Sequence, residues 1–147
     1  MLNFPGRNFG PTGMDQNLTT GQTSKNFEAR QTCFREQYSV LGEMRATDDV
    51  LAENLADNVA LEMTYKAWKK QDELGKKILP GVEYTSDQAF FTAFAQNWCS
   101  VSKGASGTHS MGKLRLLLTL QNSRQFSEAF SCPIGSFMNP SKKCSLW

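Results

Sequence analysis

The sequence predicts a mainly α-helical protein. Apolar residues recur at helical spacing in several short segments, and Gly, Pro and Ser turns separate those segments. Little of the chain alternates apolar and polar residues, which is the pattern typical of half-buried strands. A chain of 147 residues has the length of one domain. We therefore expect residues 24–147 to form a single domain, preceded by a loop over residues 1–23.

Composition indicates a globular protein and argues against two kinds of partner. The chain is 39% hydrophobic and 20% charged, with a net charge of +2, and its lysine pairs are scattered. Such scatter is unlike a nucleic-acid-binding stripe or a polybasic membrane patch. No apolar window is long enough to span a membrane, and the first residues lack the pattern of a secretory signal. We expect no signal or transmembrane segment in this chain.

The first helix is expected to follow a glycine-rich N-terminal segment. Glycines between residues 6 and 21 interrupt any periodicity there. Ser24 is a plausible N-cap, and the helix should end near Gly42. Four of its residues would face a core: Phe27, Cys33, Phe34 and Tyr38.

The central helix should be capped by Thr47 or Asp48 and run to about Lys70. At 100° per residue, Glu53 and Asp57 fall on one stripe within an otherwise apolar surface. A carboxylate in such a place needs a hydrogen-bond partner or a cation, so a positive group should face the stripe. One interpretation is that both residues are solvated or paired with lysines, which the pattern alone favours. The other is that Glu53 ligates a metal and Asp57 orients a metal-bound histidine.

Three further segments complete the chain. Ser86 should cap a helix with an aromatic stripe, and a loop of small residues then leads to His109. The leucine-rich run around Arg115 is extended or helical by its pattern, and Asn122 or Ser123 should start a last helix. Arg115 inside an apolar run needs an anionic or carbonyl partner, either a substrate or a carboxylate of the central helix.

Several motifs in one order resemble a known family. They are ENLAD at residues 53–57, FFTAFAQNWC at 90–99, HSMGKLR at 109–115, TLQNS at 119–123, FSEAFSC at 126–132 and MNPSKKCSLW at 138–147. Together they resemble the neprilysin and endothelin-converting enzyme family of zinc metallopeptidases, over about residues 6–147. The resemblance implies the C-terminal part of a zincin-like, mostly helical ectodomain that is extracellular or at the cell surface.

The resemblance also implies roles for individual residues. Glu53 corresponds to the third zinc ligand, and Asp57 to the carboxylate behind a zinc-bound histidine. His109 corresponds to the histidine that hydrogen-bonds the oxyanion, and Arg115 to the arginine that holds a substrate carbonyl. The implied cofactor is zinc, and the implied substrates are short peptides.

The zinc-binding motif of such enzymes, His-Glu-x-x-His, does not occur in the sequence, whose single histidine is His109. We therefore expect the C-terminal catalytic-domain portion of a zinc metalloendopeptidase, without hydrolysis by this chain alone. The alternative is a non-catalytic, peptide-binding relative. Val59 and Ala60 stand where the family often has glycines, and Gly107 where it commonly has an aspartate, which favours that alternative.

Four cysteines allow three complete pairings, and their spacing does not select one. By resemblance, Cys33 pairs with Cys144. Cys99 and Cys132 match positions that in the family bridge to a region outside this sequence, so we expect them to be unpaired or joined to each other.

Overall fold

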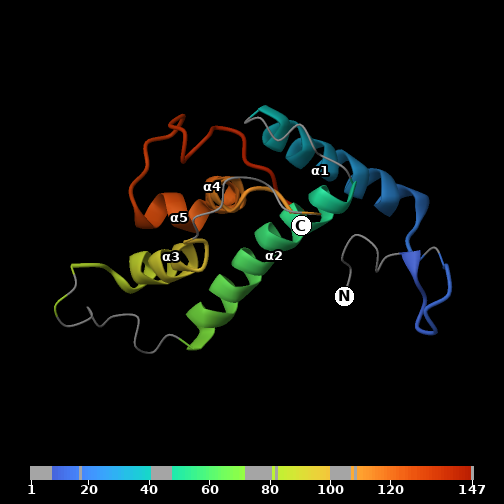
Figure 1. Cartoon of the computed structure of the whole chain (residues 1–147), viewed down its shortest axis with the longest axis horizontal. Helices are drawn as coiled ribbons and strands as arrows, with labels where there is room; N and C mark the ends of the chain where they lie inside the picture. The colour runs from blue at the N-terminus through green and yellow to red at the C-terminus, as the bar shows by residue number, and fades with distance from the viewer. Residues whose placement is uncertain are drawn as a thin grey trace.

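The computed structural model confirms a mainly helical protein (Figure 1). It describes residues 8–16, 18–40, 48–71, 81, 83–99, 107 and 109–146. The helices are α1 (Gly21–Val40), α2 (Asp48–Gln71), α3 (Ser86–Gln96), α4 (Gly112–Asn122) and α5 (Arg124–Ala129). The structure has isolated β-bridges between Phe9 and Asp15 and between Ser136 and Asn139.

Helix α2 is the element against which α1 and α4 pack, while α5 contacts α3 and α4 (Figure 1). It begins at Asp48, the first residue of the predicted run, and its last residue lies one beyond the predicted end, while Thr47 lies outside the described residues. Asp48 and Asp49 lie in its first turn, and Lys69 and Lys70 in its last turn. These charges oppose the partial charges at the two helix ends and so stabilise the helix.

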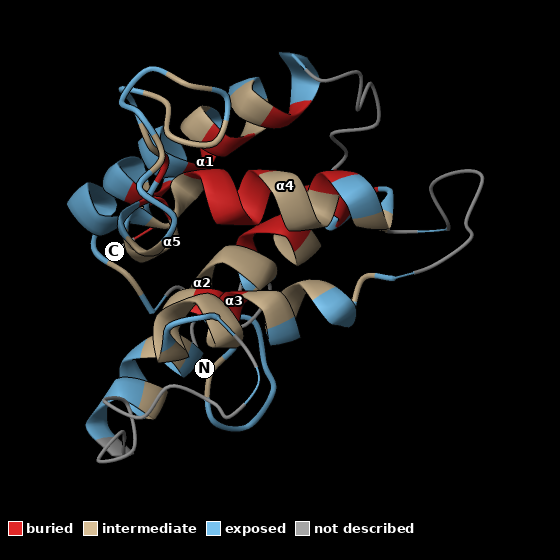
Figure 2. Cartoon of the chain, turned by 90° about the vertical axis from the view of Figure 1, so that its left-hand side faces the viewer, coloured by how far each residue is buried: buried red, intermediate tan, exposed pale blue. Residues whose placement is uncertain are grey.

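The buried residues form two clusters. The first joins α1, α2 and α4 to the tail of the chain and contains Phe27, Phe34, Tyr38, Leu51, Leu55, Leu114, Leu118, Cys144 and Leu146. The second consists of Leu61, Phe91 and Leu120, with partly buried aromatic residues of α2, α3 and α5 around it. Figure 2 shows the buried residues of α1, α2 and α4 on the sides that face one another. The predicted core face of the first helix is confirmed by Phe27, Phe34 and Tyr38.

Two of the predicted helix caps are wrong, by four residues at α1 and by one residue at α3. Helix α1 begins at Gly21, so residues 21–23 are helical and Ser24 lies inside the first turn. The Oγ1 atom of Thr20 accepts a hydrogen bond from the N–H of Thr23 at 3.2 Å, which is the bond of an N-cap residue.

Helix α3 is capped by Thr85 rather than Ser86. Its hydroxyl accepts from the N–H of Gln88, whose side chain accepts in return from the N–H of Thr85. This reciprocal capping box satisfies two donors that a cap at Ser86 would leave open. For α5 the predicted Ser123 is the N-cap and accepts from the N–H of Phe126 at 3.1 Å.

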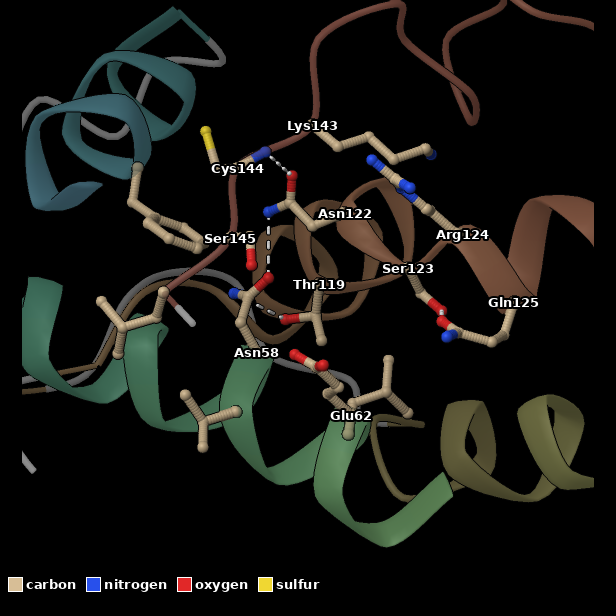
Figure 3. A pocket seen from close by; sticks show the side chains of 14 residues that line it. Asn58, Glu62, Thr119, Asn122, Ser123, Arg124, Gln125, Lys143, Cys144 and Ser145 are labelled. Atoms are coloured by element: carbon tan, nitrogen blue, oxygen red, sulfur yellow. Dashed lines mark hydrogen bonds between the residues drawn. The ribbon is translucent and has the colours of Figure 1, made fainter. Parts of the chain in front are cut away.

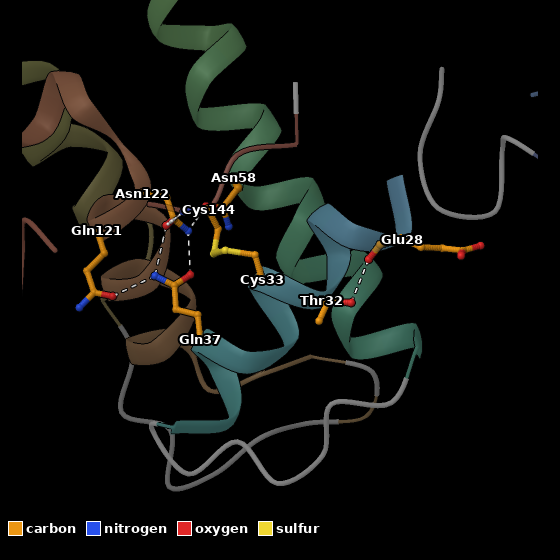
Figure 4. The surroundings of a disulfide bond; sticks show 8 residues. All are labelled: Glu28, Thr32, Cys33, Gln37, Asn58, Gln121, Asn122 and Cys144. Atoms are coloured by element: carbon orange, nitrogen blue, oxygen red, sulfur yellow. Dashed lines mark hydrogen bonds between the residues drawn. A yellow bond between two sulfur atoms is a disulfide. The ribbon is translucent and has the colours of Figure 1, made fainter. Parts of the chain in front are cut away.

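A disulfide between Cys33 and Cys144 fastens the tail to α1 (Figure 4). Beside it, the N–H of Cys144 donates to Oδ1 of Asn122 at 2.9 Å, and Arg30 donates to the carbonyl of Leu146 at 2.6 Å. Cys99 and Cys132 are free thiols. None of the described helices has both the length and the apolar composition needed to cross a membrane.

Candidate active site

Asp57 on α2 and Arg115 on α4 form a closely matched ion pair. Nε and Nη2 of Arg115 donate to the two carboxylate oxygens of Asp57 at 2.6 and 2.7 Å. The two side chains are only 13% and 16% exposed. Burial raises the pKa of Asp57, while the bonds from Arg115 act against that rise. The hydrogen bond to Asp57 is the main reason that the pKa of Arg115 is also raised.

The guanidinium of Arg115 also lies over the ring of Trp98, 4.6 Å from its centroid. An arginine in this position is attracted to the face of the indole. Arg115 is therefore fixed on two sides, by a carboxylate in its plane and by an aromatic ring. The leucine-rich run that carries it is helical, which resolves the alternative that its pattern left open.

Glu53 and His109 form the second pair of the site. Nε2 of His109 lies 3.4 Å from Oε2 of Glu53, and the contact is an ion pair when the imidazole is protonated. The side chains are 42% and 45% exposed, so this pair faces solvent much more than the first. Glu53 precedes Asp57 by one helical turn on α2, so the two pairs follow one another along the helix.

The four residues therefore converge from two pieces of chain, α2 and the segment 109–115. The prediction that a positive group faces the acidic stripe is confirmed at Asp57, where that group is Arg115 rather than a lysine. Periodicity placed the carboxylates on one stripe but gave no indication of which residue would meet each of them.

Glu53 could supply one ligand of a zinc site, and the described residues around it do not supply the others. A carboxylate oxygen is an accepted zinc ligand, but a catalytic zinc site usually has three protein ligands. The structure, within its described ranges, has no group of three or more His, Cys, Asp and Glu side chains that could hold a metal. The residues present do not make a complete site.

Two residues beside the site were missed by sequence reasoning. Asn54 and Ser110 are 1% and 4% exposed, and Nδ2 of Asn54 donates to Oγ of Ser110 at 3.0 Å. Each is the sequence neighbour of a predicted site residue, Asn54 of Glu53 and Ser110 of His109. The available signal was the position of Asn54, which follows Val50 and Leu51 by four and three residues and so shares a helix face with them.

A cavity of about 350 Å³ lies elsewhere, between α2, the start of α5 and the tail (Figure 3). None of Glu53, Asp57, His109 and Arg115 lines it. Several polar groups in its wall are already bonded to each other, since Nδ2 of Asn122 donates to Oδ1 of Asn58 at 2.9 Å. The candidate site is therefore identified by the four ionisable side chains that lie together, and not by this cavity.

Comparison with known proteins identifies relatives along almost the whole chain. Residues 1–146 match the family described as peptidase family M13. The chain is 38% identical to neprilysin of Oryctolagus cuniculus over 159 aligned residues, which cover 97% of this chain and 21% of that protein. It is 41% identical to endothelin-converting enzyme 1 of Rattus norvegicus over 134 residues, covering 82% of this chain and 18% of that protein.

A third relative is neprilysin-21 of Caenorhabditis elegans, which is 36% identical over 86% of this chain and 19% of its own length. The chain thus spans about a fifth of the length of these relatives. The extent of the family match and the level of identity lead to one conclusion: this chain belongs to peptidase family M13.

Proposed function

We propose that this chain forms part of the catalytic centre of a zinc metalloendopeptidase that cleaves short peptides. The observation that carries the proposal is the convergence of Glu53 and Asp57 on α2 with His109 and Arg115 from one short segment. The similarity to neprilysin and to endothelin-converting enzyme 1 favours a catalytic over a non-catalytic role.

Each residue has one role in this proposal. Glu53 is the carboxylate ligand of zinc, and Asp57 orients a zinc-bound histidine. His109 donates a hydrogen bond to the oxyanion of the tetrahedral intermediate. Arg115, held by Asp57 and stacked on Trp98, directs a guanidinium at a substrate carbonyl.

The remaining groups must come from outside these 147 residues, because the sequence has a single histidine. In enzymes of this type, zinc activates a water molecule and polarises the scissile carbonyl. The residues of this chain do not by themselves fit a closed zinc site, so we assign them no step that passes through the metal. A location outside the cell or at its surface completes the proposal, and the disulfide is consistent with an oxidising compartment.

The test is a chimera in which this chain replaces the aligned segment of rabbit neprilysin. We expect the purified chimera to bind stoichiometric zinc and to hydrolyse a short peptide substrate of the parent enzyme. Glu53→Gln should lower both zinc content and activity, because it weakens a metal ligand. Glu128→Gln, at an exposed position of α5, is the matched control and should change neither.

A folded chimera that binds zinc but cleaves no peptide would contradict the catalytic proposal. It would favour the non-catalytic alternative, and binding of the same peptide to the chimera would then be measured directly.

A further inference from the structure

The feature behind this inference is the buried cross-link between α2 and the segment that carries His109. Asn54 is only 1% exposed, and its side-chain amide donates a hydrogen bond to the hydroxyl of Ser110. The two residues are 56 positions apart in the sequence. A hydrogen bond between two buried groups fixes their positions firmly, since leaving either group unpaired in the interior carries a desolvation penalty.

The cross-link lies directly behind the Glu53 and His109 pair. Consecutive helical residues point about 100° apart, so Glu53 can face solvent while Asn54 points inward. On the other side of the bond, Ser110 is buried while His109 is half exposed. The solvent-facing pair of Glu53 and His109 is therefore supported by the buried pair of Asn54 and Ser110, each one residue further along the chain.

Neighbouring contacts hold both ends of the cross-link. The side chain of Asn58 donates to the backbone carbonyl of Asn54 at 2.8 Å, which fixes this turn of α2. Beyond Ser110, α4 begins at Gly112, and its residues Leu114 and Leu118 belong to the first core cluster. The bond thus connects α2 to the segment that leads from His109 into α4.

We propose that Asn54 and Ser110 are positioning residues, whose hydrogen bond sets the location of the His109 imidazole relative to the Glu53 carboxylate. The inference rests on the proposed function, in which that spacing separates the oxyanion donor from a zinc ligand. Neither residue touches substrate or metal in this account. They act through their neighbours, by holding the backbone of 109–110 against α2.

The experiment uses nuclear magnetic resonance on the purified 147-residue chain with labelled histidine. His109 is the sole histidine, so its imidazole signals need no assignment among alternatives. We expect a nuclear Overhauser cross-peak between the imidazole Hε1 and the Hγ protons of Glu53. Ser110→Ala deletes the hydroxyl and Asn54→Ala deletes the amide. We expect each substitution to abolish the cross-peak. Ser110→Thr keeps the hydroxyl and should keep the cross-peak.

Gln88→Ala is the matched control, because it deletes a side-chain amide that caps α3 and donates to the carbonyl of Ala129, with no bond to either end of the cross-link. We expect it to lower stability and to leave the His109 cross-peak unchanged. A cross-peak of wild-type intensity in folded Ser110→Ala would overturn the proposal, as would its absence from the folded wild type. If Asn54→Ala fails to fold, Ser110→Ala alone decides.

The measurement contains neither zinc nor peptide. A negative result would therefore remove the positioning role and leave the chimera test of the proposed function untouched. An inactive chimera would in turn leave the contact between the two side chains as measured.

Discussion

Replacement of Arg115 by methionine should destabilise the fold by leaving the carboxylate of Asp57 without its two donors. Methionine keeps an unbranched stem, and the Asp57 side chain is only 13% exposed in the wild type. Removing one partner of a buried ion pair costs about 3–5 kcal/mol. Because both side chains retain some contact with water, we expect the lower end, about 3 kcal/mol at neutral pH. With an m-value of about 2 kcal/mol/M, the urea midpoint should fall by about 1.5 M.

The assay is urea unfolding followed by the helical circular dichroism signal. Arg115→Lys keeps the charge but cannot make the two parallel bonds, so it should be intermediate. Asp57→Asn in the Arg115→Met background removes the unpaired charge and should recover about 2 kcal/mol, since an unsatisfied buried polar group costs about 1–3 kcal/mol. A loss of less than about 0.5 kcal/mol in Arg115→Met, typical of a surface substitution, would refute this reasoning.

Three further predictions concern other parts of the structure. Changing Cys33 and Cys144 together to serine should lower the unfolding free energy by about 4 kcal/mol in urea, because the bond closes a loop of 111 residues. The control, Cys99→Ser at an exposed free thiol, should be neutral. Since burial raises the pKa of Asp57 above its ordinary value of 3.8, the stability of the wild type relative to Asp57→Asn should be greatest below that value. This extra stability should be lost as the pH rises through the pKa of Asp57 in the folded state. A difference in unfolding free energy between the two proteins that is constant between about pH 3 and pH 7 would contradict this. In the chimera, His109→Ala should lower kcat by about 100-fold to 1,000-fold, as for loss of an oxyanion donor, and unchanged kcat would exclude that role.

The central helix was predictable because its information is local. Acidic residues at its start, lysines at its end and a continuous apolar surface between them all indicate the same element. Helix starts near residues 20 and 85 were less certain because adjacent hydroxyl residues compete for the cap. Only the backbone conformation decides between Thr20 and Ser24, or between Thr85 and Ser86.

Partners across the site were beyond the reach of periodicity. The sequence indicated that Arg115 needs an anion, but Glu53 and Asp57 were equally acceptable candidates. The packing of α4 on α2 brings Arg115 to Asp57, and it places His109 beside Glu53. The Asn54 and Ser110 bond is of the same kind, because both residues have short polar side chains that are common on surfaces and whose burial depends on the tertiary fold.

The first core cluster has a consequence for the order in which the chain can acquire its structure. Phe27 and Phe34 of α1 share that cluster with Cys144 and Leu146, more than 100 positions further along the sequence. The packing of the inner face of α1 is therefore complete only once the segment with Cys144 and Leu146 has folded against it. Such long-range closure slows folding, since the entropy of a large loop is lost before its contacts form. Until the tail is in place, the apolar face of α1 therefore lacks part of its packing and remains open to contacts with other chains.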